Sequence, residues 1–210
     1  MATLNISEAE IARRLAHALE GYQGDPVVEI GVPAQKIEKE LVPAAVLIPL
    51  LLKDSSWHVL LTRRNANLPE HSGQVAFPGG RADPEDANLE KTALREAEEE
   101  IGLVPEDVRI LGKLKNYLTI TNYLVTPIVG VIPWPYPLRI ARKEVTRVFT
   151  VPLEWLVDPR NYEVQMRELP KPLNPIPVVF FKPYDKEILW GASARIVLAF
   201  ARALRLIQPD

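Results

Sequence analysis

The sequence of 210 residues contains no cysteine and only three histidines, His17, His58 and His71. The lack of cysteine excludes a disulfide framework, a cysteine nucleophile and a zinc site built from cysteine and histidine. Any chemistry therefore has to come from carboxylates, hydroxyl groups, lysines and arginines, or from a hard metal ion held by oxygen ligands.

The chain also lacks an excess of either charge, with 25 Lys and Arg against 27 Asp and Glu. This balance gives no overall attraction to nucleic acid or to anionic membranes, although a local basic patch stays open. The longest apolar run, Leu41 to Leu52, is about 12 residues long and contains two prolines, so it is too short to cross a bilayer. The N-terminus has no basic region before an apolar run. We therefore expect a cytoplasmic protein with neither nucleic acid nor membrane as a partner.

The sequence predicts a short N-terminal arm and one main domain. A capping box at Ser7 to Glu10 is followed by Ile11, Leu15 and Leu19 at helical spacing, and glycines at 21 and 24 end this helix. We expect an arm over residues 1–41, with a linker from residue 23, and a domain over residues 42–210. The apolar stripe packs either on its own domain, which is the simpler expectation, or across a homodimer.

Apolar patterns in the main domain predict a layered arrangement of strands and helices. Strands over 44–52 and 57–64 form a hairpin around the polar turn between them. The strongest helix spans Leu89 to Ile101 and ends at Gly102, and a closing helix spans 193–207. Further strands are expected over residues 108–114, 124–132, 144–151, 178–181 and 187–190. Strands mixed with two or three helices indicate an α/β (α+β) fold.

Three carboxylates share one arc of the strongest helix. At about 100° per residue, Glu96, Glu99 and Glu100 lie beside the apolar stripe and therefore at the margin of the core. Like charges three and four residues apart destabilise a helix by about 0.2–0.5 kcal/mol per pair, and partial burial increases the repulsion. A solvated face is the ordinary interpretation of a glutamate run. The Pro-Gly-Gly turn before the helix, with backbone carbonyls close by, favours a hard ion such as Mg²⁺ or Mn²⁺ instead.

The segment from Gly80 to Leu103 resembles the Nudix box of enzymes that hydrolyse a nucleoside diphosphate linked to another group. Five positions match the family pattern: Arg95, Glu96, Glu99, Glu100 and Gly102. Such a match arises by chance in about one window in a million. The resemblance implies an α/β/α sandwich with a mixed sheet and a loop-helix-loop that binds metal. It assigns Glu96, Glu99, Glu100 and the Gly79 carbonyl as metal ligands, and it implies that Arg95 orients the glutamates.

The spacer from Gly80 to Arg95 is one residue longer than usual, and Asp86 or Ala87 stands where a glutamate is usual. The longer spacer resembles the coenzyme A pyrophosphatase branch of the family. Leu60 to Arg64 and Gly73 to Gly80 also resemble the upstream motif of that branch. Two positions depart from it, with Asn65 in place of Ser or Ala and Pro69 in place of a basic residue.

The sequence leaves the general base open between a box glutamate and Glu144, whose alternative role is a surface ion pair with Arg142 or Arg147. Four residues are candidates for binding the substrate, although the charged ones are also typical of a solvated surface: Arg63, Arg64, His71 and Gly80.

The leading hypothesis is a hydrolase dependent on Mg²⁺ or Mn²⁺ that cuts CoA or an acyl-CoA into 4′-phosphopantetheine and adenosine 3′,5′-bisphosphate. One alternative keeps the chemistry and changes the substrate to ADP-ribose, a dinucleotide or a nucleoside triphosphate. Another is a Nudix-fold binding module without turnover, against which the complete set of glutamates argues.

Overall fold

The computed structural model describes residues 4–24, 27–28, 41–69, 71–168 and 175–208. Most of the predicted linker after residue 23 lies outside these ranges. The helices are α1 (Glu8–Ala18), α3 (Leu89–Ile101), α4 (Leu153–Leu156) and α5 (Gly191–Ala203), with short 3₁₀ turns at Pro105–Asp107 and Pro159–Asn161. The strands are β1 (Val27–Val28), β2 (Val42–Lys53), β3 (Ser56–Arg64), β4 (Val75–Ala76), β5 (Gly79–Arg81), β6 (Arg109–Lys113), β7 (Tyr117–Leu118), β8 (Tyr123–Val131), β9 (Val145–Pro152), β10 (Tyr162–Arg167) and β11 (Ile176–Phe181).

The sheet is mixed and has β2 near its centre. In the described part of the chain, nine strands join it in the order β1-β7-β8-β2-β3-β4, with β5 on β2, β6 on β8 and β9 on β3. Strand β2 runs parallel to β8 and antiparallel to β3 and β5. The β2–β3 hairpin turns through Asp54 and Ser55, both at positive φ, which confirms the predicted hairpin.

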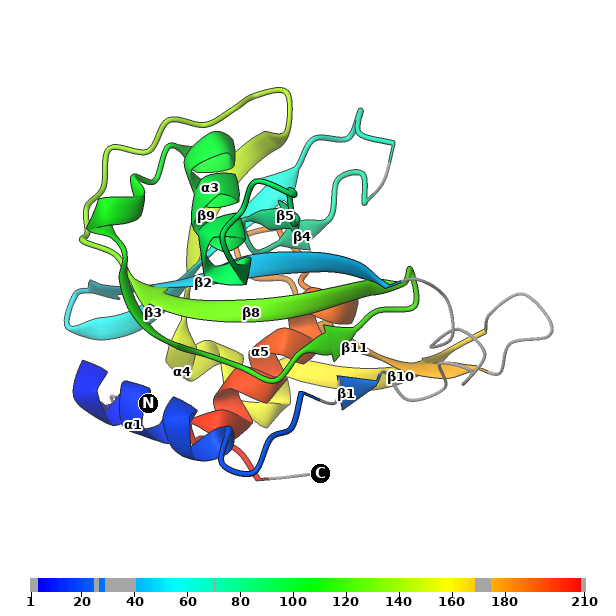
Figure 1. Ribbon diagram of the computed structural model, residues 1–210. Coiled ribbons are helices and arrows are strands. Elements are labelled where there is room, and N and C mark those ends of the chain that lie inside the picture. The colour runs from blue at the N-terminus through cyan, green and yellow to red at the C-terminus, as the bar shows by residue number, and fades with distance from the viewer. Residues whose placement is uncertain (1–3, 25–26, 29–40, 70, 169–174, 209–210) are drawn as a thin grey trace.

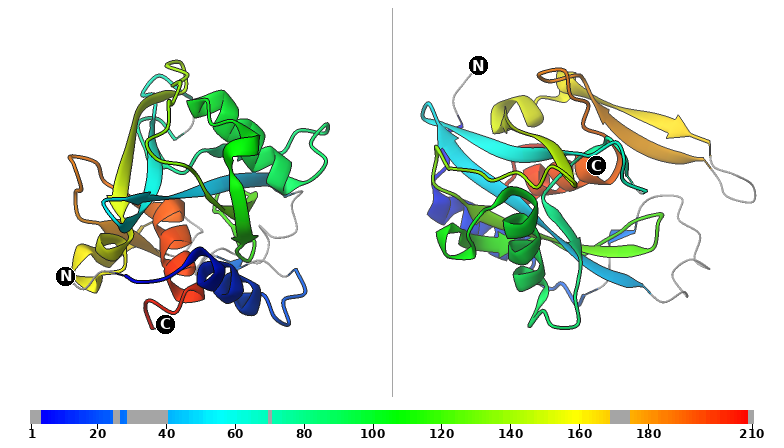
Figure 2. Two further views of the ribbon diagram at one scale, coloured as in Figure 1. Left: turned by 90° about the vertical axis from the view of Figure 1, so that its left-hand side faces the viewer. Right: turned by 90° about the horizontal axis from the view of Figure 1, so that it is seen from above.

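Helices cover both faces of the sheet, as Figures 1 and 2 show. Leu47 and Leu51 of β2 face α3, whereas Ile48 and Leu50 face the layer of α1 and α5. Because successive side chains of a strand point to opposite faces, β2 feeds both hydrophobic clusters and is apolar along most of its length. The predicted α/β/α sandwich is confirmed. None of the helices in the described ranges is long and apolar enough to span a membrane.

Helix α1 packs on its own chain. Ser7 caps it by accepting from the Glu10 amide, and Ile11 and Leu15 are fully buried in the cluster that includes α5. The Trp57 indole donates to the Ile6 carbonyl at 2.7 Å. Intramolecular packing is therefore confirmed, while the division at residues 41 and 42 and the homodimer stay predictions.

Three elements differ from their predicted form. Helix α5 spans Gly191–Ala203, so it ends before the predicted residue 207. Helix α1 ends at Ala18, before the predicted stop at Gly21 to Gly24. The strand predicted over Glu187 to Trp190 is wrong, because this segment forms two isolated bridges after a turn whose residues Asp185 and Lys186 have positive φ. Trp190 is already the N-cap of α5, so the segment is too short to continue as a strand.

Candidate active site

The candidate site is built on α3, which follows the short strand β5. Asn88 caps the helix by accepting from the Lys91 amide, and Gly102 ends it in the left-handed conformation at φ 69°. Both helix ends agree with the predicted bounds. A Cβ on Gly102 would lie 2.7 Å from Cβ of Arg139, so this glycine also allows the segment after β8 to approach the end of the helix.

The three box glutamates lie at different depths. The side chain of Glu99 is 55% exposed, that of Glu96 is 16% exposed, and that of Glu100 is 2% exposed. Burial raises the pKa of Glu96, and the nearby charges of Glu99 and Glu144 raise it further while Arg95 opposes them. The predicted position at the margin of the core is confirmed, and it places one carboxylate inside the core itself.

Glu100 is a buried acid with incomplete partners. Burial raises its pKa to about 8, although the charge of Arg64 and the Gly79 amide oppose this shift. Nη1 of Arg64 lies 3.3 Å from Oε1 of Glu100, while Oε2 is buried without a hydrogen-bond partner. A buried carboxylate is costly unless a cation or hydrogen bonds compensate it. Glu100 therefore has a free oxygen suited to a further cation.

The two glycines before α3 permit close approach. A Cβ on Gly80 would lie 2.6 Å from the Glu96 carboxylate carbon and oxygen. Gly79 has φ +152°, and a Cβ there would lie 2.4 Å from the Ala45 carbonyl oxygen of β2. The structure thus sets Gly80, predicted to bind substrate, directly against a box glutamate.

Arg95 organises the acids around it. Its guanidinium lies 3.0 Å from Glu96 and 3.2 Å from Glu99. On its other side Arg95 binds both oxygens of Asp86 at 3.1 Å. Asp86 also accepts from the Thr92 hydroxyl at 2.8 Å and from the Asp83 amide at 2.9 Å. The sequence showed an acid in the spacer but gave no means of pairing it with Arg95, because the loop conformation decides that contact.

The Asp86 carboxylate contributes stability that depends on pH. The hydrogen bond from Arg95 lowers its pKa from 3.8 to about 2. A depressed pKa stabilises the fold above the unfolded value, and this contribution is lost as pH falls through about 2. We expect Asp86→Asn to lower the free energy of unfolding by about 2 kcal/mol at pH 7, with the deficit shrinking between pH 4 and pH 2. Urea unfolding across this range measures it, with the exposed Glu85→Gln as control; a deficit independent of pH would contradict the ionic role.

Glu144 joins the carboxylates from a different part of the chain. It lies directly before β9, and its charge raises the pKa of both Glu96 and Glu100. The suggested ion pairs are not formed in the described ranges: Arg142 donates to the Thr146 carbonyl, and Arg147 binds Glu187. The long-range proximity of Glu144 to α3 could not be read from the sequence alone.

Two predicted substrate-binding residues lie elsewhere. Arg63 forms an ion pair with the buried Glu187 at 3.2 Å, whereas the next residue, Arg64, contacts Glu100. His71, at φ 55°, is exposed and shares a hydrogen bond with Gln74 at 3.1 Å. The structure therefore brings Arg64, but not Arg63 or His71, into contact with the carboxylates.

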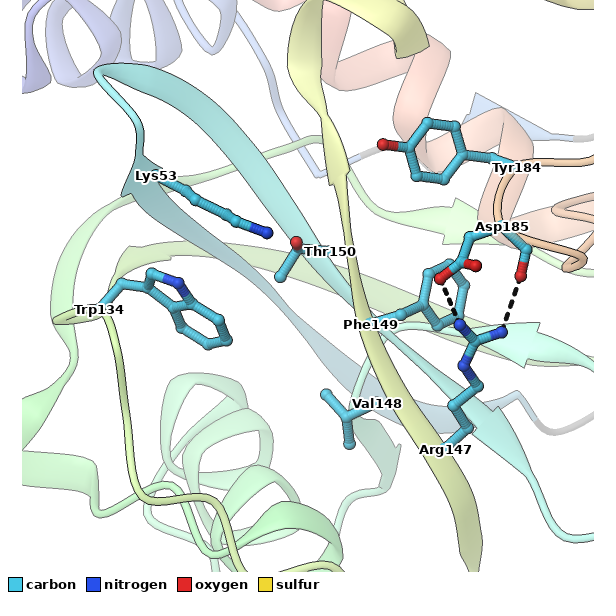
Figure 3. A pocket seen from close by; sticks show the side chains of 8 residues that line it. All are labelled: Lys53, Trp134, Arg147, Val148, Phe149, Thr150, Tyr184 and Asp185. Carbon is cyan, nitrogen blue, oxygen red and sulfur yellow. Dashed lines mark hydrogen bonds and ion pairs between the residues drawn. The ribbon is translucent and has the colours of Figure 1, made fainter.

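A cavity of ≈ 560 Å³ lies along β9. Figure 3 shows its lining, with Lys53 and Trp134 on one side of the strand and Tyr184 and Asp185 on the other. Arg147 donates to the Asp185 carbonyl at 2.8 Å there. None of the box glutamates lines this cavity, so the carboxylate cluster, and not the cavity, is the candidate catalytic site.

The donor set fits a hard divalent cation. It consists of carboxylate and backbone oxygens, and it includes the buried, unpartnered Oε2 of Glu100. Within the ranges that the structure describes, no group of three or more acidic or histidine side chains is already placed to bind a metal ion together.

The glycine turn, the acidic helix α3 and most of the mixed sheet lie within one stretch of the chain that matches a known protein family. The NUDIX domain family matches residues 41–170, and the chain belongs to that family. The prediction of a Nudix hydrolase is confirmed at this level.

Relatives with high coverage carry the same family name. The "Uncharacterized Nudix hydrolase NudL" of Photorhabdus laumondii is 37% identical over 182 residues, covering 85% of this chain and 94% of the relative. The protein of the same name from Yersinia pestis is 40% identical over 164 residues, covering 78% and 80%. Among solved structures, a MutT/nudix family protein from Enterococcus faecalis aligns with a TM-score of 0.49 at 17% identity, covering 98% of this chain and 76% of that one.

Proposed function

We propose that the chain hydrolyses the pyrophosphate bond of CoA or an acyl-CoA, releasing 4′-phosphopantetheine and adenosine 3′,5′-bisphosphate. The observation that carries the hydrolytic chemistry is the position of Glu96, Glu99 and Glu100 along one arc of α3, with one carboxylate oxygen of Glu100 buried and without a hydrogen-bond partner. The runs Leu60 to Arg64 and Gly73 to Gly80, which resemble the motif of the CoA pyrophosphatase branch, support the substrate.

To hydrolyse a pyrophosphate, a protein mainly has to position the attacking water and neutralise the negative charge of the phosphates. Water attacks one phosphorus of the P–O–P bridge, a new P–O bond forms, and the bridging P–O bond breaks as charge grows on the leaving phosphate. The proton of the water passes to a nearby carboxylate. Glu144 is a suitable acceptor because it is exposed and lies near enough for its charge to act on Glu96 and Glu100.

Glu96, Glu99, Glu100 and the Gly79 carbonyl would hold Mg²⁺ or Mn²⁺. When bound, such an ion neutralises phosphate oxygens and lowers the pKa of water. Arg95 keeps Glu96 and Glu99 in place from behind, and Asp86 fixes Arg95. Arg64, beside Glu100, provides a cation at the edge of the cluster for a substrate phosphate.

A panel of substrates tests the proposal. We expect CoA and acetyl-CoA to be cleaved with Mg²⁺ or Mn²⁺ faster than ADP-ribose, diadenosine tetraphosphate and a nucleoside triphosphate, with products separated by chromatography. A wide preference for ADP-ribose would overturn the CoA assignment and keep the reaction class. No turnover of any pyrophosphate would overturn both and favour a binding module.

A further inference from the structure

The segment that carries Glu144 is attached to the end of α3. The Arg139 amide donates to the Ile101 carbonyl at 2.8 Å, and the Ala141 amide donates to the Glu100 carbonyl at 2.9 Å. These bonds satisfy carbonyls that a helix end otherwise leaves free. These two bonds tie the first half of the segment over residues 139–144 to the end of α3. They do not reach its second half, which carries Glu144.

Asn65, the residue after β3, holds the second half. Its backbone amide donates to the Glu144 carbonyl at 2.7 Å, and its side-chain Nδ2 donates to the Arg142 carbonyl at 2.9 Å. Two carbonyls of one short segment thus bind a single residue. The end of β3 and the start of β9 are joined here, beside the ladder that pairs these strands.

The orientation of the Asn65 amide is fixed from its other side. Its Oδ1 accepts from the Asn67 amide at 2.9 Å, and its carbonyl accepts from the Leu68 amide at 3.2 Å. An asparagine side chain can accept at oxygen and donate at nitrogen at the same time. Alanine can do neither, and a serine hydroxyl is shorter and has one hydrogen. The upstream motif of the coenzyme A pyrophosphatase branch has Ser or Ala at this position. Asn65 therefore adds the side-chain hydrogen bond to the Arg142 carbonyl.

We propose that Asn65 is a positioning residue whose side-chain bond to the Arg142 carbonyl, added to its backbone bond to the Glu144 carbonyl, holds Glu144 beside the box carboxylates. The proposal rests on the proposed function, in which Glu144 accepts the proton of the attacking water. Asn65 does not touch the substrate; it limits the movement of the segment from which Glu144 projects. Small displacements of a general base reduce the rate strongly because the proton must pass over hydrogen-bond distance.

A double-mutant cycle tests the proposal. Asn65→Ala keeps the backbone bond to the Glu144 carbonyl and removes the side-chain bond to the Arg142 carbonyl. We expect this variant to lower kcat about 10-fold while KM changes less than about 2-fold, and Glu144→Gln to lower kcat about 100-fold. In the Glu144→Gln background, Asn65→Ala should cause no further fall, because there is no base left to position. The control is Asn67→Ala, which keeps the backbone amide that binds Asn65 and should retain normal kcat.

Amide hydrogen exchange gives a second readout without turnover. Exchange over residues 141–146 should be faster in Asn65→Ala and unchanged in Asn67→Ala. Unchanged kcat in Asn65→Ala, or an equal fall in both backgrounds, would overturn the role through Glu144. If the wild-type chain cleaves no pyrophosphate, the proposed function fails instead, and exchange that is unchanged in Asn65→Ala would separately overturn the holding of this segment.

Discussion

Glu100→Gln is expected to reduce turnover at least about 1000-fold and to remove the thermal stabilisation that Mg²⁺ gives the wild-type chain. The substitution keeps the shape of the side chain but removes the charge that a divalent ion needs at the most buried position of the cluster. The fold without metal should persist, because burial already raises the pKa of Glu100 to about 8 and the folded chain therefore accepts a neutral group at pH 7. Substrate turnover and melting curves with and without Mg²⁺ measure the two effects.

The helix supplies a control for this prediction. Glu98 belongs to the same glutamate run but is exposed, so Glu98→Gln changes the net charge equally without touching the cluster. Normal turnover and normal stabilisation by Mg²⁺ are expected in that variant. Near-normal rates in Glu100→Gln would refute the metal role of Glu100, whereas equal losses in both variants would point to net charge as the cause.

Local signals decided which parts of the site could be predicted. The bounds of α3 follow from apolar periodicity and from Gly102, both of which act within a few residues. The spacing of Glu96, Glu99 and Glu100 on one arc is likewise a property of the helix itself. The β2–β3 hairpin is also local, because the polar residues between two apolar runs determine the turn.

Contacts between distant segments could not be predicted in the same way. The choice of Glu187 as partner of Arg63 depends on the turn at Asp185 and Lys186, which the apolar pattern of the segment concealed. The pairing of Asp86 with Arg95 depends on the conformation of the spacer loop. The different depths of the three glutamates depend on what packs over the helix, which helical periodicity does not specify.

Gly80→Ala is expected to lower kcat/KM about 100-fold while leaving the free energy of unfolding within about 1 kcal/mol of the wild-type value. The added Cβ would lie 2.6 Å from the Glu96 carboxylate, which is the far end of a flexible side chain and can turn away. The backbone stays unstrained because Gly80 does not have positive φ. The loss would therefore come from a displaced carboxylate in a folded protein.

Gly79→Ala provides the contrasting result one residue earlier. Its Cβ would meet the Ala45 carbonyl oxygen at 2.4 Å, and its φ of +152° disfavours any side chain. Because β2 is central in the sheet, the backbone cannot yield easily, and we expect a loss of about 3 kcal/mol in unfolding free energy. Denaturant unfolding and turnover measured on both variants separate the effects. Full activity in Gly80→Ala would show that the position of Glu96 against this glycine is not needed for the reaction, and would leave Glu99 and Glu100 as the glutamates on which hydrolysis depends.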